Sequence, residues 1–217
     1  MQDWHTAGTL SQEIRLYQEG IRRGIAFTFI TFGDKKDLRW QGVYSGIEVV
    51  PIFPCQKKPQ SRIGLWFHAW YSQFGLEDKV SRPDIVKTNQ ILGGLLATAM
   101  AARWSTPLLV RCGYEPYRFV EASSGPWWKA KFIHWYARTV YRSATRIHVA
   151  TDNDKKYAVA QLFSKKKQPV INVHPNWVDT RRFRRSSKDP NRGSMVDGRV
   201  LAVGRSVGQK NFRLLGY

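Results

Sequence analysis

The feature that most constrains the fold is a regular alternation of short apolar runs with amphipathic helical patterns. Several of the runs are apolar on both faces, as expected of buried parallel strands. We predict strands at residues 25–32, 47–53, 84–88, 108–111, 146–150, 170–174 and 199–203. Helices are predicted between them at residues 10–22, 62–74, 91–104, 127–143 and 152–163. Such alternation indicates an α/β protein with a Rossmann-like, doubly wound parallel sheet.

The domain organisation follows from the places where this alternation is interrupted. A polar, basic stretch at residues 184–198 looks like a linker. We therefore place a Rossmann-like domain at residues 1–183 and the beginning of a second domain at residues 199–217. The chain opens on a loop and a helix, whereas doubly wound domains usually begin with a central strand. We expect a fragment that lacks a first strand and most of its second domain.

Composition limits the classes of partner and compartment. The net charge of +19 favours anionic partners, whereas 42% hydrophobic and 13% aromatic residues are ample for a packed core and exclude general disorder. No apolar run approaches the roughly 20 residues of a membrane span, and no signal peptide is visible. Cys55 and Cys112 are too few for a disulfide framework. We expect a reduced, cytoplasmic protein, and the spacing of its His and Cys residues predicts no metal site.

The most specific motifs lie on the two sides of the linker. Residues 173–183 read VHPNWVDTRRF, and residues 199–215 read RVLAVGRSVGQKNFRLL. Together they resemble the interdomain region of retaining GT-B glycosyltransferases of family 4 (group 1), with its xPNGVDxxxF and xxxVGRxxxxKN segments. The matching residues are Pro175, Asn176, Val178, Asp179 and Phe183, then Val203, Gly204, Arg205, Lys210 and Asn211. Trp177 stands where the family more often has Gly.

This resemblance implies that a sugar moves, with retention, from a nucleotide-sugar donor to a glycan or lipid-linked acceptor. It assigns Arg205 and Lys210 to the donor diphosphate. The leaving diphosphate gains negative charge in the transition state, so fixed cations stabilise it directly. The alternative is a solvated pair of cations after an edge strand. The family is thought to use the departing phosphate as proton acceptor, so no catalytic base, cofactor or metal is assigned.

Two segments of the first domain extend the resemblance. Residues 4–13 (WHTAGTLSQE) resemble the glycine-containing loop that faces the donor, which makes Gly8 and Thr9 candidates for phosphate contact. Thr9 and Gln12 fit a capping box, and Gly24 a helix stop.

The segments KTNQ (87–90) and VRCGYE (110–115) follow two predicted parallel strands, so both should open onto one crevice. VRCGYE resembles the RxGYE of a subgroup of the family, which makes Arg111 and Glu115 candidates for positioning the acceptor. A structural pair of Arg111 with Glu115 is the alternative, and the residues alone leave both open.

An aromatic and basic helix is predicted from Trp127 to Arg142 (residues 127–142). Trp128, Phe132 and Trp135 lie on its apolar face with Tyr136 and Val140. Such a helix can lie on an anionic membrane, which would place the protein peripherally on the inner face, or it can pack in the core with a solvated basic edge. The sequence leaves both alternatives open.

A competing hypothesis is a basic nucleic-acid-binding module. Residues 155–192 carry eleven basic residues against two acidic ones. No helix-turn-helix, RNP or zinc-knuckle pattern supports this function, so we expect no nucleic acid partner.

Overall fold

The computed structural model of the chain describes residues 1–54, 59, 61–113, 126–162, 168–177 and 180. Within it, Met1–Asn176 forms one compact unit, to which the following description applies. Its elements, in chain order, are α1 (Gln2–Thr6), α2 (Leu10–Arg22), β1 (Phe27–Asp34), the 3-10 helix η1 (Lys35–Trp40), β2 (Ile47–Phe53), α3 (Arg62–Leu76), β3 (Val86–Lys87), the 3-10 helix η2 (Ile91–Gly93), α4 (Gly94–Arg103), β4 (Leu108–Cys112), α6 (Trp127–Ser143), β5 (Arg146–Val149), α7 (Asp152–Gln161) and β6 (Val170–Val173).

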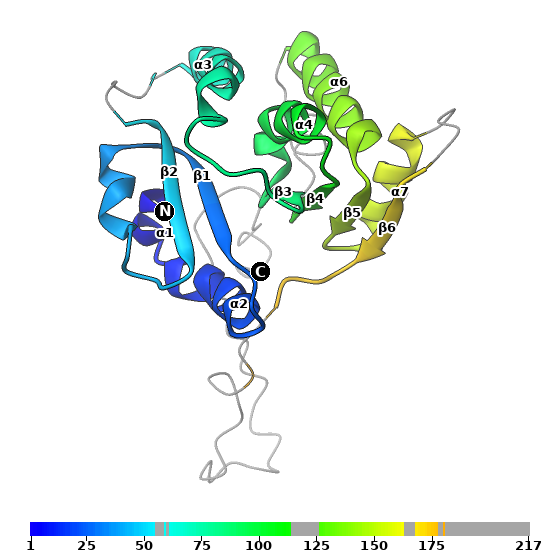
Figure 1. Cartoon of the computed structure of the whole chain (residues 1–217). Coiled ribbons are helices and arrows are strands. Elements are labelled where there is room, and N and C mark those ends of the chain that lie inside the picture. The colour runs from blue at the N-terminus through cyan, green and yellow to red at the C-terminus, as the bar shows by residue number, and fades with distance from the viewer. Residues whose placement is uncertain (55–58, 60, 114–125, 163–167, 178–179, 181–217) are drawn as a thin grey trace, which may run out of the picture. The chain divides into compact units, whose positions relative to one another are not determined.

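The predicted parallel α/β class is confirmed. Strands β3, β4, β5 and β6 form a sheet in that order, and each neighbouring pair is parallel. Helix α4 connects β3 to β4, α6 connects β4 to β5, and α7 connects β5 to β6 (Figure 1). Because all four strands are parallel, their carboxyl ends lie at the same edge of the sheet.

The expectation of one continuous sheet is wrong for the described strands. β1 pairs in parallel with β2 as a separate two-stranded sheet, and no described strand hydrogen-bonds to both β1 and β3. Side-chain packing joins the two sheets instead. Leu96 and Met100 of α4 pack with Val50 of β2, while Ala101 of the same helix belongs to the core of the larger sheet.

The larger sheet holds the main core of the unit. Val110 of β4 and Ile147 of β5 are fully buried, and so are Val140 and Tyr141 of α6. Leu162, at the end of α7, closes the same cluster. This core fixes the strands whose carboxyl ends carry the polar segments discussed below.

Helix α2 begins and ends where the sequence pattern predicts. Gly24 has a φ of +83°, which glycine adopts without strain, so the predicted stop is confirmed. The predicted capping box is wrong. The Thr9 side chain makes no cap hydrogen bond, since its hydroxyl donates to the carbonyl oxygen of Trp4 at 3.4 Å.

The predicted loop before α2 contains the short helix α1. The buried carboxylate of Asp37 accepts a hydrogen bond from the Gln2 backbone N–H at 2.6 Å and lies 3.4 Å from the Met1 amino group. These contacts hold the first turn of α1 in place. Asp37 lies about 35 residues further along the chain, so the periodicity of the N-terminal sequence does not predict them.

The predicted linker and second domain lie outside the described residues, as does the predicted strand at 199–203, so the domain boundaries remain predictions. Among the helices that the structure describes, none combines the length and apolarity that crossing a bilayer requires.

Candidate functional site

The segments that follow β3 and β4 are hydrogen-bonded to each other at the carboxyl end of the larger sheet. The Arg111 backbone N–H donates to the Thr88 hydroxyl at 3.0 Å, and that hydroxyl lies 3.3 Å from the Arg111 carbonyl oxygen. The Gly113 N–H donates to the Gln90 side-chain oxygen at 3.2 Å. The expectation that KTNQ and VRCGYE open onto the same end of the sheet is therefore confirmed.

The guanidinium of Arg111 is held by two amide side chains. One terminal nitrogen donates to Oδ1 of Asn89, after β3, at 3.2 Å, and the other donates to Oδ1 of Asn176, after β6, at 3.1 Å. Asn176 belongs to the HPNW segment singled out in the sequence. A single side chain thus connects the RCGYE-type segment with the predicted interdomain motif, across 65 residues of chain.

Lys87 lies beside Arg111 and contacts Tyr17 of α2. Its Nζ donates to the Tyr17 hydroxyl at 3.1 Å and lies 5.2 Å from the ring centroid, and the hydroxyl donates in turn to Oδ1 of Asn89 at 3.2 Å. The pKa of Lys87 is lowered to about 8, mainly by burial and in smaller part by the nearby Arg111, while Glu13 raises it slightly. Burial also raises the pKa of Tyr17 to about 12, with a smaller contribution from Glu13.

Two histidine side chains belong to the next two strands of the larger sheet, near the same carboxyl edge. The ring centroids of His148, on β5, and His174, just after β6, are 4.4 Å apart. The His174 N–H donates to the Val149 carbonyl at 2.7 Å, which anchors its backbone to the sheet. Burial lowers the pKa of His148, and His174, Lys87, Arg146 and Arg111 lower it further. The neutral imidazole, which can both donate and accept, is therefore favoured.

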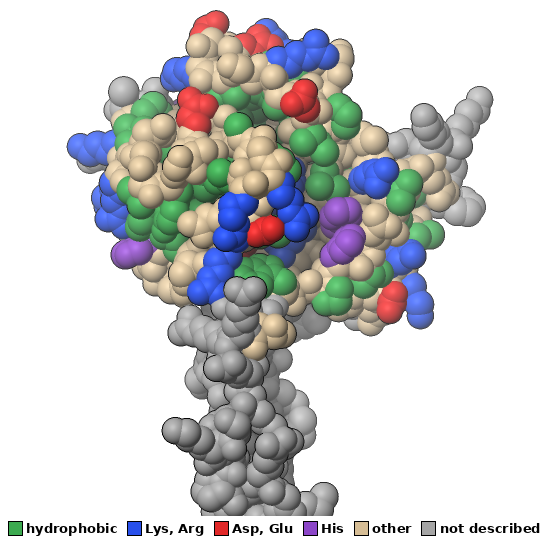
Figure 2. Space-filling model, turned by 60° about the horizontal axis from the view of Figure 1, so that its bottom comes forward, with side chains coloured by type: hydrophobic (Ala, Val, Ile, Leu, Met, Phe, Trp, Pro, Cys, Tyr) green, Lys and Arg blue, Asp and Glu red, His purple; other side chains and the backbone are tan. Residues whose placement is uncertain are grey.

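We refer to Lys87, Arg111, His148 and His174, with the neutral partners Tyr17, Asn89 and Asn176, as the basic cluster. Figure 2 shows Lys and Arg side chains gathered around acidic atoms on one face of the molecule, with His side chains nearby. Among the described residues, no carboxylate forms an ion pair with Lys87 or Arg111; Glu13 acts on Lys87 only at longer range. The cluster is suited to binding an anion.

Sequence reasoning found only part of this cluster. It selects Arg111 and quotes Lys87 and Asn176 within motifs, but it gives the histidines no binding role and does not select Tyr17. The available indication is that His148 lies within one predicted parallel strand (146–150) and His174 at the end of the next one along the chain (170–174). The contact of Tyr17 with Lys87, 70 residues away, has no local sequence pattern.

The other predicted site residues are not joined to the cluster by the described contacts. Gly8, at φ +70°, lies in an exposed turn between α1 and α2, where a residue other than glycine would be strained. The Thr9 hydroxyl donates a hydrogen bond to the Trp4 carbonyl oxygen. Glu115, Arg205 and Lys210 lie outside the described residues, so their roles remain predictions.

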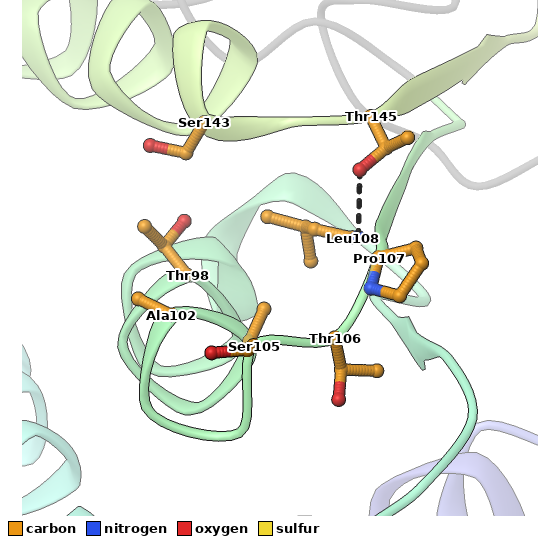
Figure 3. Close-up of a pocket in the computed structure, with 9 residues that line it drawn as sticks. Thr98, Ala102, Ser105, Thr106, Pro107, Leu108, Ser143 and Thr145 are labelled. Atoms are coloured by element: carbon orange, nitrogen blue, oxygen red, sulfur yellow. Dashed lines mark hydrogen bonds between the residues drawn. The ribbon is translucent and has the colours of Figure 1, made fainter.

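A hollow of about 390 Å³ lies at the other end of the sheet (Figure 3). Its polar lining consists of the hydroxyls of Thr98, Ser105, Thr106, Ser143 and Thr145, around the amino ends of β4 and β5. The Thr145 hydroxyl already accepts the Leu108 N–H at 3.1 Å. No charged side chain among the described residues lines this hollow, and open parallel sheets bind ligands at the carboxyl ends of their strands. The basic cluster is the better candidate.

Metal ligands are not grouped in the part of the chain that the structure describes. No set of three or more His, Cys, Asp or Glu side chains there is placed to hold an ion.

Comparisons with known proteins agree with the fold. A family profile described as a glycosyl transferase 4-like domain matches residues 14–177. The crystal structure of Arabidopsis thaliana UGT89C1 complexed with UDP-L-rhamnose is similar, with a TM-score of 0.51 and 11% sequence identity. The similarity covers 78% of this chain and 49% of UGT89C1, so the chain spans about half the length of that protein. No curated protein has a significant sequence match to the chain.

Proposed function

Because this chain belongs to the glycosyl transferase 4-like family of GT-B sugar-transferring proteins, we propose that it serves a retaining transfer of a sugar from a nucleotide-sugar donor to a glycan or lipid-linked acceptor. The observation that carries the proposal is the pair of hydrogen bonds from Arg111 to Asn89 and to Asn176. They join the segment expected to position the acceptor to the motif expected to enter the donor domain.

In this proposal one set of charged residues binds the donor and another positions the acceptor. Arg205 and Lys210 hold the donor diphosphate, with Gly8 and Thr9 approaching it from the first domain, and stabilise the charge that it gains on leaving. Arg111 and Glu115 position the acceptor hydroxyl near the anomeric carbon, which lowers the entropic part of the barrier. The departing phosphate takes the proton of that hydroxyl, so the proposal needs neither a metal nor a side-chain base.

The exposed aromatic residues of α6 support an acceptor that lies at a membrane. Trp127, Trp128 and Trp135 are 70%, 52% and 53% exposed, although tryptophan is usually largely buried. The Nζ atoms of Lys131 and Lys129 lie 4.6 and 5.6 Å from the ring centroids of Trp127 and Trp128. Interfacial Trp with neighbouring cations is typical of helices that lie on anionic bilayers.

Helix α3 exposes a second set of aromatic side chains, namely Trp70, Tyr71 and Phe74. Both α3 and α6 pack against α4, and Figure 1 shows the two helices on the same side of the unit. Neither helix contains an acidic residue. We therefore propose that α6, with α3 beside it, rests on an anionic membrane surface and brings the site to a lipid-linked acceptor.

The transfer is tested by incubating the protein with a panel of nucleotide sugars and lipid-linked or glycan acceptors, and by determining the anomeric configuration of the product by NMR. A charge-assisted contact contributes about 1.5–3 kcal/mol. The variants Arg205→Ala and Lys210→Ala should therefore each lower turnover or nucleotide binding by roughly one to two orders of magnitude. An inverted product, or unchanged kinetics in both variants, would contradict the proposal.

A further inference from the structure

The basic cluster brings two cations together, and among the described residues no carboxylate forms an ion pair with either of them, although Glu13 acts on Lys87 at longer range. Lys87 and Arg111 occupy neighbouring strands, and both are partly buried. Their described hydrogen-bond partners are the Tyr17 hydroxyl and the amide oxygens of Asn89 and Asn176, all uncharged. Like charges that are withdrawn from water repel each other and lose hydration, so this arrangement is costly unless an anion compensates it.

Most of the donor capacity of the cluster is not used by described partners. Arg111 has five side-chain N–H donors, of which two carry the bonds to Asn89 and Asn176. Lys87 has three, of which one bonds to Tyr17. The amide oxygens fix the plane of the guanidinium, and Tyr17 fixes the ammonium, so the remaining donors are pre-oriented.

We propose that the basic cluster binds a phosphate group carried by the acceptor substrate. This inference rests on the proposed function, in which the donor diphosphate is held elsewhere, by Arg205 and Lys210. Arg111 would supply a fork of N–H donors to two phosphate oxygens and Lys87 a point charge, while His148 and His174 donate or accept according to the protonation of the phosphate.

The charge of the cluster favours phosphate over a carboxylate. Two fixed cations match the charge of about −1.5 to −2 of a phosphomonoester at neutral pH. Glu13 acts on Lys87 from a distance and would repel any anion weakly. The cluster would recognise the same phosphate group on a soluble sugar and on a lipid carrier.

The inference is tested by isothermal titration of the whole chain with glucose 6-phosphate, geranyl diphosphate, glucose and UDP. We expect at least one of the two phosphorylated acceptor probes to bind and glucose not to bind. Tighter binding of glucose 6-phosphate would indicate an acceptor phosphate on a soluble sugar, and tighter binding of geranyl diphosphate one on a lipid carrier. Arg111→Gln and Lys87→Met should each weaken that binding at least tenfold. The matched controls, Arg82→Gln and Lys79→Met, remove the same charges at exposed positions away from the cluster and should change it less than twofold.

Asn89→Asp gives a second variant with nearly unchanged shape. It places a carboxylate within 3.2 Å of the Arg111 nitrogen and should weaken phosphate binding at least tenfold while leaving the melting temperature unchanged or higher. Unchanged binding in Asn89→Asp would overturn the inference.

Equal losses in the control variants, displacement of the bound probe by UDP, or failure of both phosphorylated probes to bind would also overturn it. Sugar transfer without phosphate binding would overturn this inference and leave the proposed function intact. Phosphate binding without transfer to any acceptor would instead count against the proposed function.

Discussion

Lys87 illustrates how neighbours decide the charge of a single side chain. Its ammonium group donates to the Tyr17 hydroxyl, which donates to Asn89, so a chain of neutral groups takes the place of a counter-ion. Burial lowers the pKa of Lys87 from 10.5 to about 8. The folded protein therefore holds this proton less tightly than the unfolded chain does.

This shift predicts that the free energy of unfolding rises between pH 8 and pH 10. Below pH 8 Lys87 is charged in both states, so the cost of burying the charge is fully present. Between its folded and unfolded pKa values the folded state has lost the proton while the unfolded state retains it, and stability increases with pH. The increase amounts to at most about 3 kcal/mol.

Above pH 10 the trend should reverse, because burial raises the pKa of Tyr17 and of Tyr136 to about 12. Urea unfolding at a series of pH values measures the profile. Lys87→Met should lack the rise between pH 8 and pH 10, and an identical rise in this variant would show that another group causes it.

At the scale of the element, α6 (Trp127–Ser143) has a buried second half and an exposed beginning. Tyr136, Val140 and Tyr141 of its second half are buried in the core, which confirms core packing for that half. Trp127 and Trp128 at its beginning are exposed. A periodic pattern reports where apolar side chains lie around a helix, but not how far along the helix its neighbours extend.

The exposed half of α6 predicts a charge-dependent affinity for membranes. In Lys129→Gln/Lys131→Gln, binding to vesicles with 30% anionic lipid should fall about thirtyfold, because each lysine near such a surface contributes about 1 kcal/mol. The matched control is Lys35→Gln/Lys36→Gln in η1. Sedimentation with vesicles measures both variants, and equal losses in the two would show that only the net charge matters.

The contact between α4 and α6 predicts opposite effects of one substitution at two helical glycines. A Cβ at Gly94 would lie 2.5 Å from a methyl group of the buried Val140, whereas a Cβ at Gly75 of α3 would meet nothing within 4 Å. Gly94→Ala should destabilise the protein by about 1–3 kcal/mol, and Gly75→Ala should stabilise it by up to about 1 kcal/mol. Chemical denaturation distinguishes them, and a neutral Gly94→Ala would mean that the helices can separate without cost.

At the scale of the whole compact unit, the division into two sheets distributes stability unevenly. The larger sheet has internal strands, β4 and β5, whereas both strands of the β1–β2 sheet are edges in the described structure. Edge backbone is less protected, and regions with fewer internal hydrogen bonds open at lower free energy.

Hydrogen exchange should therefore protect β4 and β5 more strongly than β1 and β2. Mass spectrometry of deuterated peptides measures the difference, which we expect to reach at least tenfold in exchange rate. Equal protection of all four strands would indicate that the unit opens only as a whole.

Part of the fold could be predicted because it depends on local pattern. The bounds of α2 and α6 and of β2 agree with the sequence prediction, since a helix or strand that buries one face must repeat its apolar residues with the corresponding period. The boundary of β3 was less well predicted, because its two residues pair only where Val86 and Lys87 meet β4. The family resemblance was also accessible, because its motifs are continuous in the chain.

The sequence by itself determined the α/β class, the order of the elements, the family and the convergence of KTNQ with VRCGYE. Only the tertiary structure decided that β1 and β2 form their own sheet, that Arg111 donates a hydrogen bond to Asn176 and that Lys87 donates one to Tyr17. The physical reason is the range of the interactions. Periodicity records which face of an element is buried, whereas these hydrogen bonds join residues 65 and 70 positions apart and depend on packing that no local pattern encodes.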